Sequence, residues 1–465
     1  MRILFLLALF IAPCIANAQL GFAYIDSISV QGNKKTKESI ILREMLVRAG
    51  DTVSLAELSA LMDRSEELIM NTGMFNQAEV SFKTWEGSTN KIHLLVHVEE
   101  TWYLYPVPIF ELADRNFNVW WVEQGRSLQR LNFGMEFAHL NFSGSRDRLK
   151  ISAKYGYTRK YALSYNLPFF NKVQTLGLSA DASFLRNREI NYATVGNKQE
   201  FFRDGEAFLY QRFHTNLALT YRPRIKASHN FIAGFRQNWV DDIVVEEKNP
   251  DFFLEGRSLQ RYFLMAYRFT FDKRDVRPYP WKGSYFQAVL EKDGLGIFQD
   301  RNALTFWTGY RRYLPFGKRW SLGLEANAKY SFIREQQPYN DNRAMGFGSH
   351  YLHGYEYYIM DGLDMLMGRS ALRFNLWEWG MDFGKVMPIK AFQRMPVRLC
   401  LSLNNDLGYA NDPYTGHLNA LNNRLLWGGG IGLDIVLYYD KVIQIEYSFN
   451  DLMENGLFLH LNLNI

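Results

Sequence analysis

Few residues in the chain could do chemistry, and their spacing does not build a catalytic site. Nine histidines are scattered over 465 residues. His350 and His353 form an H-x-x-H pair, as in zinc sites, but they stand in a Gly-rich segment rather than on a helix that would align them. Asp272, Asp275 and Asp406 could be combined with His353 into a hydrolase-like catalytic site, but no spacing in the sequence supports that combination. Neither a G-x-S-x-G elbow nor a phosphate loop is present. The sequence predicts no enzyme, no metal site and no cofactor.

The elements that carry these residues are strands. In LFLHLNLNI (457–465) every second residue from Leu457 to Ile465 is apolar, and His460 lies on the opposite face. The preceding segments VIQIEYS and GGIGLDIVLYY alternate in the same way. A period of two indicates strands with one apolar and one polar face. Strands of about ten residues with this pattern are typical of membrane β-barrels.

The alternating pattern recurs along three quarters of the chain. An even number of strands is expected for a bacterial single-chain barrel. Charged residues such as Lys150, Arg373 and Arg398 should face the lumen, because each would cost about 2–4 kcal/mol against lipid near the midplane. Sixteen segments are predicted, near 102–112, 129–141, 147–158, 160–168, 174–187, 205–222, 228–240, 258–273, 283–293, 300–315, 320–333, 367–380, 395–409, 426–438, 441–448 and 457–465.

The N-terminus has the features of a secretory signal. Arg2 precedes the apolar run ILFLLALFIA, and ANA (16–18) is a small-x-small cleavage site, so residues 1–18 are predicted to be a signal peptide. A lipoprotein signal ending at Cys14 is the alternative, but Pro13 occupies a position that should be small. The mature chain would keep one cysteine, Cys400, which excludes an intramolecular disulfide.

Composition narrows the class further. The formal charge of +5 is mild for this length, and Lys and Arg are scattered through the strands, so no nucleic-acid partner is predicted. Aromatic residues make up 16% of the chain, which suits the aromatic girdles of a membrane barrel. A large, aromatic-rich soluble β-sandwich is one alternative. An elongated soluble sheet is another, but it would have to cover its apolar face, and no helical segments remain to do so.

Residues 24–100 differ from the rest and predict a small α+β domain. The pattern is strand (24–32), helix (36–45), helix (54–73) and a hairpin (75–87 and 90–100). His93 and His97 stand four residues apart on the last strand, where a partner-facing or solvated role is expected. The remainder, 101–465, is predicted to be the barrel.

One connection is much longer than the others. Residues 334–366 join the eleventh and twelfth predicted strands, and a loop of this length is usually functional or disordered. Its glycines and aromatic residues argue against disorder. We expect this segment to fold back into the lumen.

The motifs in these segments resemble a known family. ISVQGNKKTKESII (28–41) and IMNTGMFNQAEVSF (69–82) are similar to the POTRA domain of the BamA-like outer-membrane assembly and two-partner-secretion superfamily. GFGSHYLHGYEYYIMDGLDMLMGRSALRFNL (346–376) resembles the lid loop of that superfamily, and 271–291, 401–410 and 428–449 resemble flanking barrel segments. The resemblance covers 24–465 in the expected order, with a single POTRA-like unit.

The resemblance implies a site at the lid loop. It assigns the loop tip to His353, Gly354, Tyr355 and Glu356. It also suggests lumen residues that would dock the tip, namely Asp272, Asp275, Arg277, Arg373 and Asp406.

Two positions depart from the family pattern. The family carries arginine at the loop tip, where this chain has His353, which lacks the bidentate fork of arginine and is fully charged only below its pKa, near 6.5 when unperturbed. The tip could therefore be held more weakly, or by Tyr355 and Glu356, or by Arg343 or Arg369. The family usually ends in an aromatic residue, whereas this chain ends in Ile465.

The expected function follows from the resemblance. A BamA-like barrel would insert or translocate polypeptides at the cell outer membrane, with its POTRA-like domain in the periplasm. Its partners would be outer-membrane lipid, unfolded outer-membrane or secreted polypeptides, and a periplasmic protein at residues 24–100. The alternatives are a structural or docking barrel without insertase activity, a passive channel and, least favoured, an enzyme.

Overall fold

The computed structural model describes residues 21–462, apart from residues 88, 172, 225, 278, 385–393 and 438–440. The predicted signal peptide, 1–18, lies outside the described residues. The chain divides into two compact units. The first holds the chain up to Tyr105 together with His139–Arg148, and the second holds Pro106–Ala138 and Leu149–Ile465. Within the described part of the chain, no helix combines the length and apolarity needed to cross a membrane.

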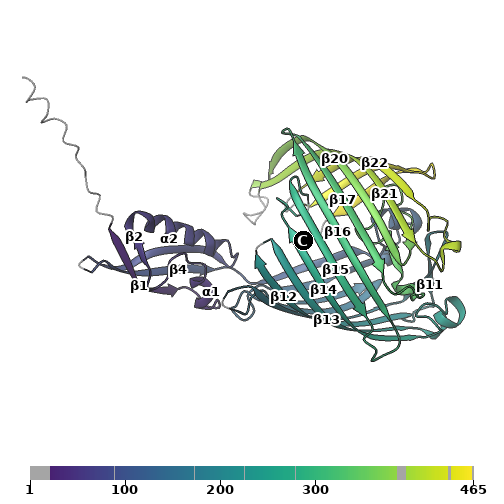
Figure 1. Ribbon diagram of the computed structural model, residues 1–465, viewed down its shortest axis with the longest axis horizontal. Coiled ribbons are helices and arrows are strands. Elements are labelled where there is room, and N and C mark those ends of the chain that lie inside the picture. Colours follow the sequence, from purple (N-terminus) through teal and green to yellow (C-terminus); the bar gives the residue numbers. More distant parts are fainter. Residues whose placement is uncertain are drawn as a thin grey trace, which may run out of the picture. The chain divides into compact units, whose positions relative to one another are not determined.

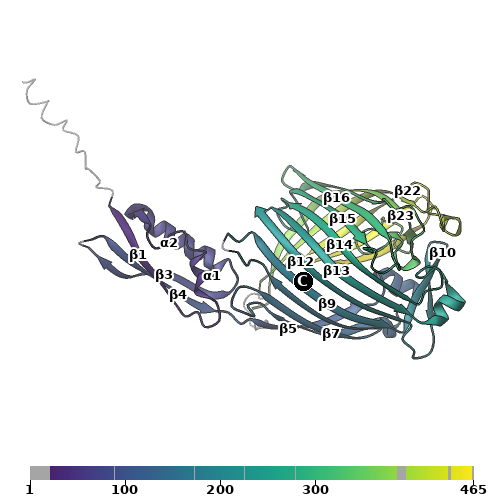
Figure 2. The same ribbon diagram turned by 60° about the horizontal axis from the view of Figure 1, so that its bottom comes forward.

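The first unit is a four-stranded sheet with two helices, α1 (Glu38–Leu42) and α2 (Leu55–Met70) (Figure 2). Its strand order is β2-β1-β4-β3, with β1 and β4 parallel. Alternate residues of β4, from Ile92 to Val98, are at most 1% exposed and form the core with α2. The sequence pattern missed β2, a three-residue strand. The strands are β1 (Phe22–Gln31), β2 (Thr52–Ser54), β3 (Phe75–Glu86) and β4 (Lys91–Glu100).

The second unit is built on one sheet of sixteen strands (Figure 1), as predicted. The order runs from β24 to β5, and the pairs described are antiparallel. The strands are β5 (Leu104–Leu112), β6 (Leu131–His139), β7 (Arg148–Gly156), β8 (Thr158–Leu167), β9 (Leu176–Asn187), β12 (Tyr210–Arg224), β13 (Ala227–Val240), β14 (Leu259–Asp272), β15 (Gly283–Asp293), β16 (Ala303–Phe316), β17 (Trp320–Ser331), β20 (Asp364–Asp382), β21 (Arg394–Asn411), β22 (Leu426–Val436), β23 (Val442–Asn450) and β24 (Asn455–Asn462).

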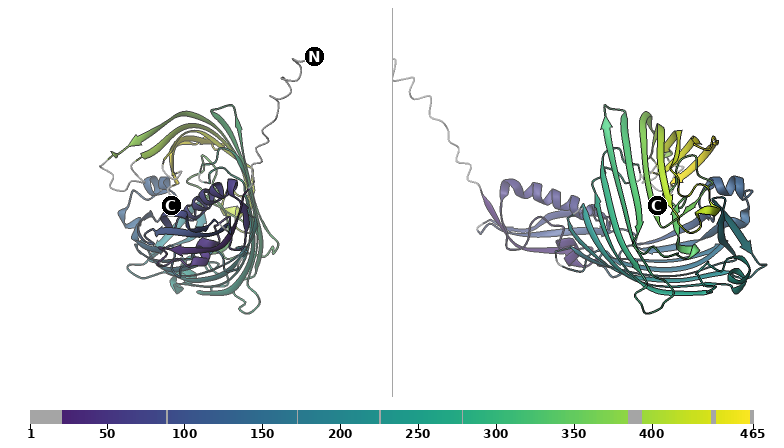
Figure 3. Two further views of the ribbon diagram at one scale, coloured as in Figure 1. Left: turned by 90° about the vertical axis from the view of Figure 1, so that its left-hand side faces the viewer. Right: turned by 45° about the vertical axis from the view of Figure 1, so that its right-hand side comes forward.

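The sheet curls so that its two faces meet different surroundings (Figure 3). On β14 the outer face carries Phe263, Met265 and Tyr267, which are exposed, whereas Leu264 between them is buried. Alternate side chains point to opposite faces of a strand, so the outer face becomes an apolar belt.

The inner face carries paired charges, as the alternation predicts. Lys150 on β7 lies 2.7 Å from Glu136 on β6, and Lys154 lies 2.8 Å from Glu111 on β5. The first pair joins neighbouring strands, the second reaches across β6, and both keep the charges away from the apolar belt.

The connections differ between the two ends of this sheet. At the end where β17 stops, which we call the loop end, several connections are long. They contain η1 (Val119–Glu123), η2 (Leu128–Arg130), β10 (Glu189–Val195), β11 (Lys198–Arg203), η3 (Val244–Lys248), η4 (Tyr339–Asp341), β18 (Arg343–Met345), β19 (Met360–Asp361) and η7 (Gly416–Leu418).

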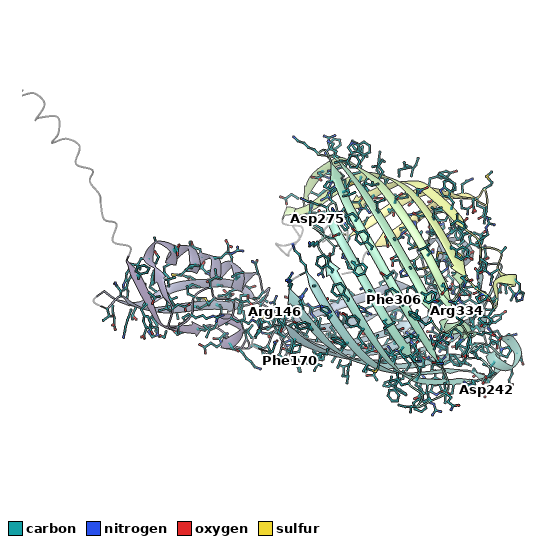
Figure 4. All side chains as sticks on the ribbon, in the orientation of Figure 1. Arg146, Phe170, Asp242, Asp275, Phe306 and Arg334 are labelled. Carbon is teal, nitrogen blue, oxygen red and sulfur yellow. The ribbon has the colours of Figure 1, made fainter. Side chains whose placement is uncertain are left out.

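The opposite end, which we call the turn end, has shorter connections such as 273–282 between β14 and β15. In Figure 4, Asp275 lies at the turn end, and Arg334 and Asp242 lie at the loop end.

Candidate functional site

The lid loop runs from residue 332 to 363, between β17 and β20, two to three residues earlier than predicted at each end. Its short strands β18 and β19 pair with each other. Leu352 and Tyr355, at 0% and 1% exposure, pack in one apolar cluster with Met365 and Met367 of β20. These two methionines are buried, whereas Leu366 between them is 63% exposed on the outer face. The lid loop therefore lies against the inner face of the sheet.

The loop tip is attached to the sheet through His353. Its backbone N–H and its Nδ1 both bond Oδ2 of Asp406 on β21, at 3.0 and 2.6 Å. Its Nε2 lies 3.3 Å from Oε2 of Glu446 on β23. Both carboxylates are fully buried, and His353 is 8% exposed. The imidazole therefore bridges two strands that are not neighbours.

The charge on His353 follows from these contacts. Burial by itself lowers the pKa of His353, but Asp406, Glu446 and Glu356 outweigh it and raise that pKa to about 9. An opposite charge at hydrogen-bonding distance favours the protonated imidazole. His353 is consequently a cation at neutral pH, as arginine would be.

Asp406 closes a row of alternating charges on the inner wall. Arg311, Glu325, Arg369 and Asp406 are register partners on β16, β17, β20 and β21. Glu325 lies 3.0 Å from Arg311 and 2.8 Å from Arg369. The next partner in the row is Gly428 on β22, and it brings no charge. His353 provides the cation that follows Asp406.

Glycines make room for the loop. A Cβ on Gly428 would lie 1.9 Å from the carbonyl oxygen of His353, and one on Gly408 would lie 2.6 Å from Leu352. Gly354 has φ +84°, and a Cβ there would lie 2.6 Å from the carbonyl oxygen of Phe449. A side chain at any of these positions would push the loop off the wall. The triple glycine GGG (428–430) thus fits the docked tip.

The other tip residues contact β23, β24 and the turn between them. Tyr355 donates its hydroxyl hydrogen to Asp451, and Asn450 donates to the carbonyl of Gly354 at 2.7 Å. Glu356 is fully buried, with Oε1 3.3 Å from Nε2 of His460 on β24. All four predicted tip residues thus lie on the wall formed by the last four strands.

Four of the predicted docking residues lie elsewhere. Asp272 pairs with Arg274 and Arg277, at 2.9 and 3.2 Å. Asp275 accepts backbone N–H groups of the turn 273–282, and Arg373 donates to the carbonyl of Pro280 in that turn at 3.0 Å.

The placement predicted for Asp272, Asp275, Arg277 and Arg373 is therefore corrected. They stabilise the turn end, whereas the lid loop enters from the loop end. Of the predicted set, Asp406 contacts the tip.

Further contacts were missed by sequence reasoning. Glu446 and His460 stand on the polar faces of their strands, which was the available signal for a lumen-facing role. The segment 113–130 after β5 also holds the loop, since Arg115 donates to the carbonyls of Gly346 and Tyr358, both at 3.1 Å. No motif marks that segment. Of the alternative anchors, Arg369 donates to the carbonyl of Tyr351 at 3.5 Å, and Arg343 lies over the ring of Phe347.

The sixteen-stranded sheet, the docked loop and the preceding α+β unit define the class of the protein, an outer-membrane β-barrel of the assembly and translocation type. A POTRA model, described as a surface antigen variable number repeat, matches residues 23–101. A model of the Omp85 superfamily domain matches residues 141–371. The chain belongs to the Omp85 superfamily, as a member with a single matched POTRA domain.

Solved structures show the same fold. BamA from Haemophilus ducreyi, solved without its POTRA domains 1–3, superposes with a TM-score of 0.67 at 14% identity, over 94% of this chain and 83% of that one. CdiB from Escherichia coli superposes with a TM-score of 0.50 at 11% identity, over 97% and 92%. A search of curated protein sequences finds no significant match.

Proposed function

We propose that this protein inserts or translocates polypeptides at the outer membrane of a Gram-negative-type cell, through an opening between the two edge strands of its sheet. The observation that carries the proposal is the strand order, which places β24 and β5 at the two ends of one curled sheet. An edge strand offers backbone N–H and C=O groups to another extended chain. In lipid those groups must be bonded, so a client strand is favoured there.

The composition of β5 supports an edge that opens. Pro106 and Pro108 occupy two of its nine positions and have no N–H to donate. Proline in a sheet is confined to edges, strand starts and bulges. Two of the nine residues of β5 therefore offer no N–H donor to a neighbouring strand.

The loop end argues against a passive channel. Asn197, at the tip of the β10–β11 hairpin, donates to the carbonyl of Ile359 in the lid loop and to Asn422, both at 3.0 Å. Its backbone N–H also bonds Asn419 at 2.8 Å. These three loops are joined through buried polar groups, which are costly to separate. Free diffusion through the sheet's interior would require that network to break.

The POTRA unit supports a role in receiving extended clients. Its sheet order leaves β3 at an edge, where Phe82 and Trp85 are 46% and 50% exposed. Their rings lie 5.8 Å apart and form an apolar patch beside the open backbone. His93 lies on β4, an interior strand, and contacts Ser27, so β3 is the better place for a client or a periplasmic partner to bind. The proposal assigns no catalytic residue and no cofactor.

A structural barrel without insertase activity is the second candidate. The single POTRA-like unit and the histidine in place of arginine at the loop tip favour that alternative. The docking of a charged His353 on Asp406 and Glu446 answers the second of these arguments, because the tip is still held by a cation between buried carboxylates.

A reversible staple across the seam tests the proposal. Phe110→Cys, at an outer-face position of β5, would be combined with Leu457→Cys, Leu459→Cys or Leu461→Cys on the outer face of β24. Assembly of a model β-barrel client into lipid vesicles would be measured before and after reduction. Loss of assembly under oxidation, restored by reduction, supports opening. The control is a staple at Ile232 and Ala266, register partners on interior strands β13 and β14, which should leave assembly unchanged. A seam staple that forms without affecting assembly would contradict the proposal.

A further inference from the structure

The backbone of the edge strand β24 is bonded by a side chain of a distant segment. The N–H of Leu459 donates to Oδ1 of Asn118 at 2.8 Å, and Nδ2 of Asn118 donates back to the carbonyl of Leu459 at 3.3 Å. Asn118 directly precedes η1, in the connection between β5 and β6, and is 4% exposed. One carboxamide thus satisfies both backbone groups of one edge residue.

This pair of bonds copies the pairing between antiparallel strands. In a hydrogen-bonded residue pair of an antiparallel ladder, each residue receives one N–H and gives one. A carboxamide has one acceptor oxygen and N–H donors, so it can make the same two bonds as a residue of a neighbouring strand. Because successive residues direct their backbone groups to opposite sides, those of Leu457 and Leu461 face the same side as those of Leu459. Asn118 therefore occupies the position of one residue of a strand that would pair with β24.

The segment that places Asn118 also holds the lid loop. Asn116 donates to the carbonyl of Glu356 at 2.9 Å, and its Oδ1 accepts the N–H of Val119 at 2.8 Å, which fixes the turn that carries Asn118. Arg115 donates to the carbonyls of Gly346 and Tyr358. Residues 115–118 thus connect the lid loop to the edge of β24.

A second contact joins the same two parts. His460, next to Leu459 on β24, stacks on Tyr351 of the lid loop at 5.0 Å between ring centroids and lies 3.3 Å from Glu356. Glu356 is thus held by Asn116 through its carbonyl and lies against His460 through its carboxylate. A movement of β24 at Leu459 would therefore disturb the contacts of His460 with Tyr351 and with Glu356.

We propose that the Asn118 carboxamide is a placeholder for one peptide group of an extended polypeptide, which binds β24 at Leu457–Leu461 by displacing it. The exchange replaces two side-chain hydrogen bonds with two backbone ones, so the backbone groups of Leu459 are never left unbonded beside lipid. Displacement of Asn118 pulls on residues 115 and 116 and loosens the lid loop. This inference rests on the proposed function and names the residue that occupies the client-binding edge of β24 when no client is bound.

Peptide capture by the full chain in lipid vesicles tests the placeholder. The probe is a labelled peptide with the sequence VIQIEYSFN, a copy of β23, which already pairs with β24 in register. A photoreactive residue replaces Leu461, which is 43% exposed on β24. Asn118→Ala should capture about tenfold more probe than the unchanged chain, because two hydrogen bonds no longer compete with it.

Other substitutions of Asn118 distinguish the contributions of its two hydrogen bonds with Leu459. Asn118→Asp keeps the acceptor for the Leu459 N–H but sets a carboxylate against the Leu459 carbonyl, so it should behave like Asn118→Ala. Asn118→Gln keeps the carboxamide and should return capture toward the original level. The matched control is Asn405→Ala, which removes a carboxamide that accepts a 2.8 Å hydrogen bond from Trp427 on β22, away from the edge.

The outcomes are distinguishable from those of the proposed function. Equal capture by Asn118→Ala and the unchanged chain, with both folded by electrophoretic mobility, would overturn the placeholder. Equal capture of a probe with prolines at its central positions would do so as well, because that probe cannot donate the backbone bonds. Increased capture in a protein that assembles no client into vesicles would support the placeholder and refute the insertase.

Discussion

His353 and Asp406 are joined twice, since one carboxylate oxygen of Asp406 accepts both the backbone N–H and the imidazole Nδ1 of His353. The first bond fixes the position of the chain at the loop tip, and the second fixes the direction of the ring. With the ring so directed, Nε2 points to Glu446 on β23. This double contact holds the tip of the lid loop on the wall.

Removal of the imidazole should destabilise the barrel. His353→Ala would leave Asp406 and Glu446 buried without their cation, and breaking a buried pair costs about 3–5 kcal/mol. We expect a lower melting temperature, measured by loss of the compact band in electrophoresis, and increased ion conductance in planar bilayers. His353→Arg keeps the positive charge and should retain most of both properties. Unchanged conductance and melting in His353→Ala would show that the tip is held by other contacts.

The docking of the lid loop should depend on pH in the alkaline range. The pKa of His353 is raised to about 9 in the folded protein, against roughly 6.5 for an unperturbed histidine. The stabilisation from its charge is therefore complete below about 6.5 and is lost as the pH rises through about 9.

Protease cleavage of the lid loop should consequently be faster at alkaline pH than at neutral pH. The matched variant is His353→Arg, whose charge does not titrate in this range, so its cleavage should not change with pH. A pH response of equal size in both proteins would mean that His353 is not its source.

The glycine opposite the tip should tolerate no side chain. Gly428→Ala would place a methyl group 1.9 Å from the carbonyl oxygen of His353, so the loop must move or the strand must shift. We expect faster protease cleavage in the lid loop and a lower melting temperature. Gly368→Ala on β20 is the control, because its Cβ would meet nothing within 4 Å. Similar effects of the two substitutions would argue against a close approach at Gly428.

Two separate positions of the lid loop are held by one lysine. Nζ of Lys329 on β17 donates to the carbonyls of Arg343 and Gly362, each at 2.8 Å, and the residue is 6% exposed. Lys329→Met keeps the length of the side chain but leaves two carbonyls without their donor, at about 1–3 kcal/mol each.

Chemical denaturation should show that loss as a lower midpoint in Lys329→Met. Lys154→Met provides the comparison, because its partner Glu111 is half exposed and water can replace the lysine. A midpoint shift no larger in Lys329→Met than in Lys154→Met would contradict the role assigned to Lys329.

The sequence by itself determined the strands of the sixteen-stranded sheet, their number and their faces. A period of two fixes which residues share a face, so Leu457 and Leu461 could be placed outside and His460 inside without a structure. The same pattern isolated the lid loop as by far the longest connection between strands. The resemblance of that stretch to a known family then supplied its tip residues, among which His353 is attached to the wall.

Only the tertiary structure decided which wall residues meet the tip. The sequence predicts both Asp406 and Asp272 to be inner-face carboxylates. In the structure Asp272 lies at the turn end of β14, whereas Asp406 on β21 lies in the row of alternating charges that begins at Arg311. The stagger between strands sets how far along the barrel wall each residue lies. Alternation along one strand contains no information about that position.

The contact between Asn118 and Leu459 lies further from sequence reasoning, since it joins positions 341 residues apart. Its asparagine stands in an irregular segment, where no periodicity indicates a direction. A single residue there acquires its role from the fold that brings it to the edge of β24.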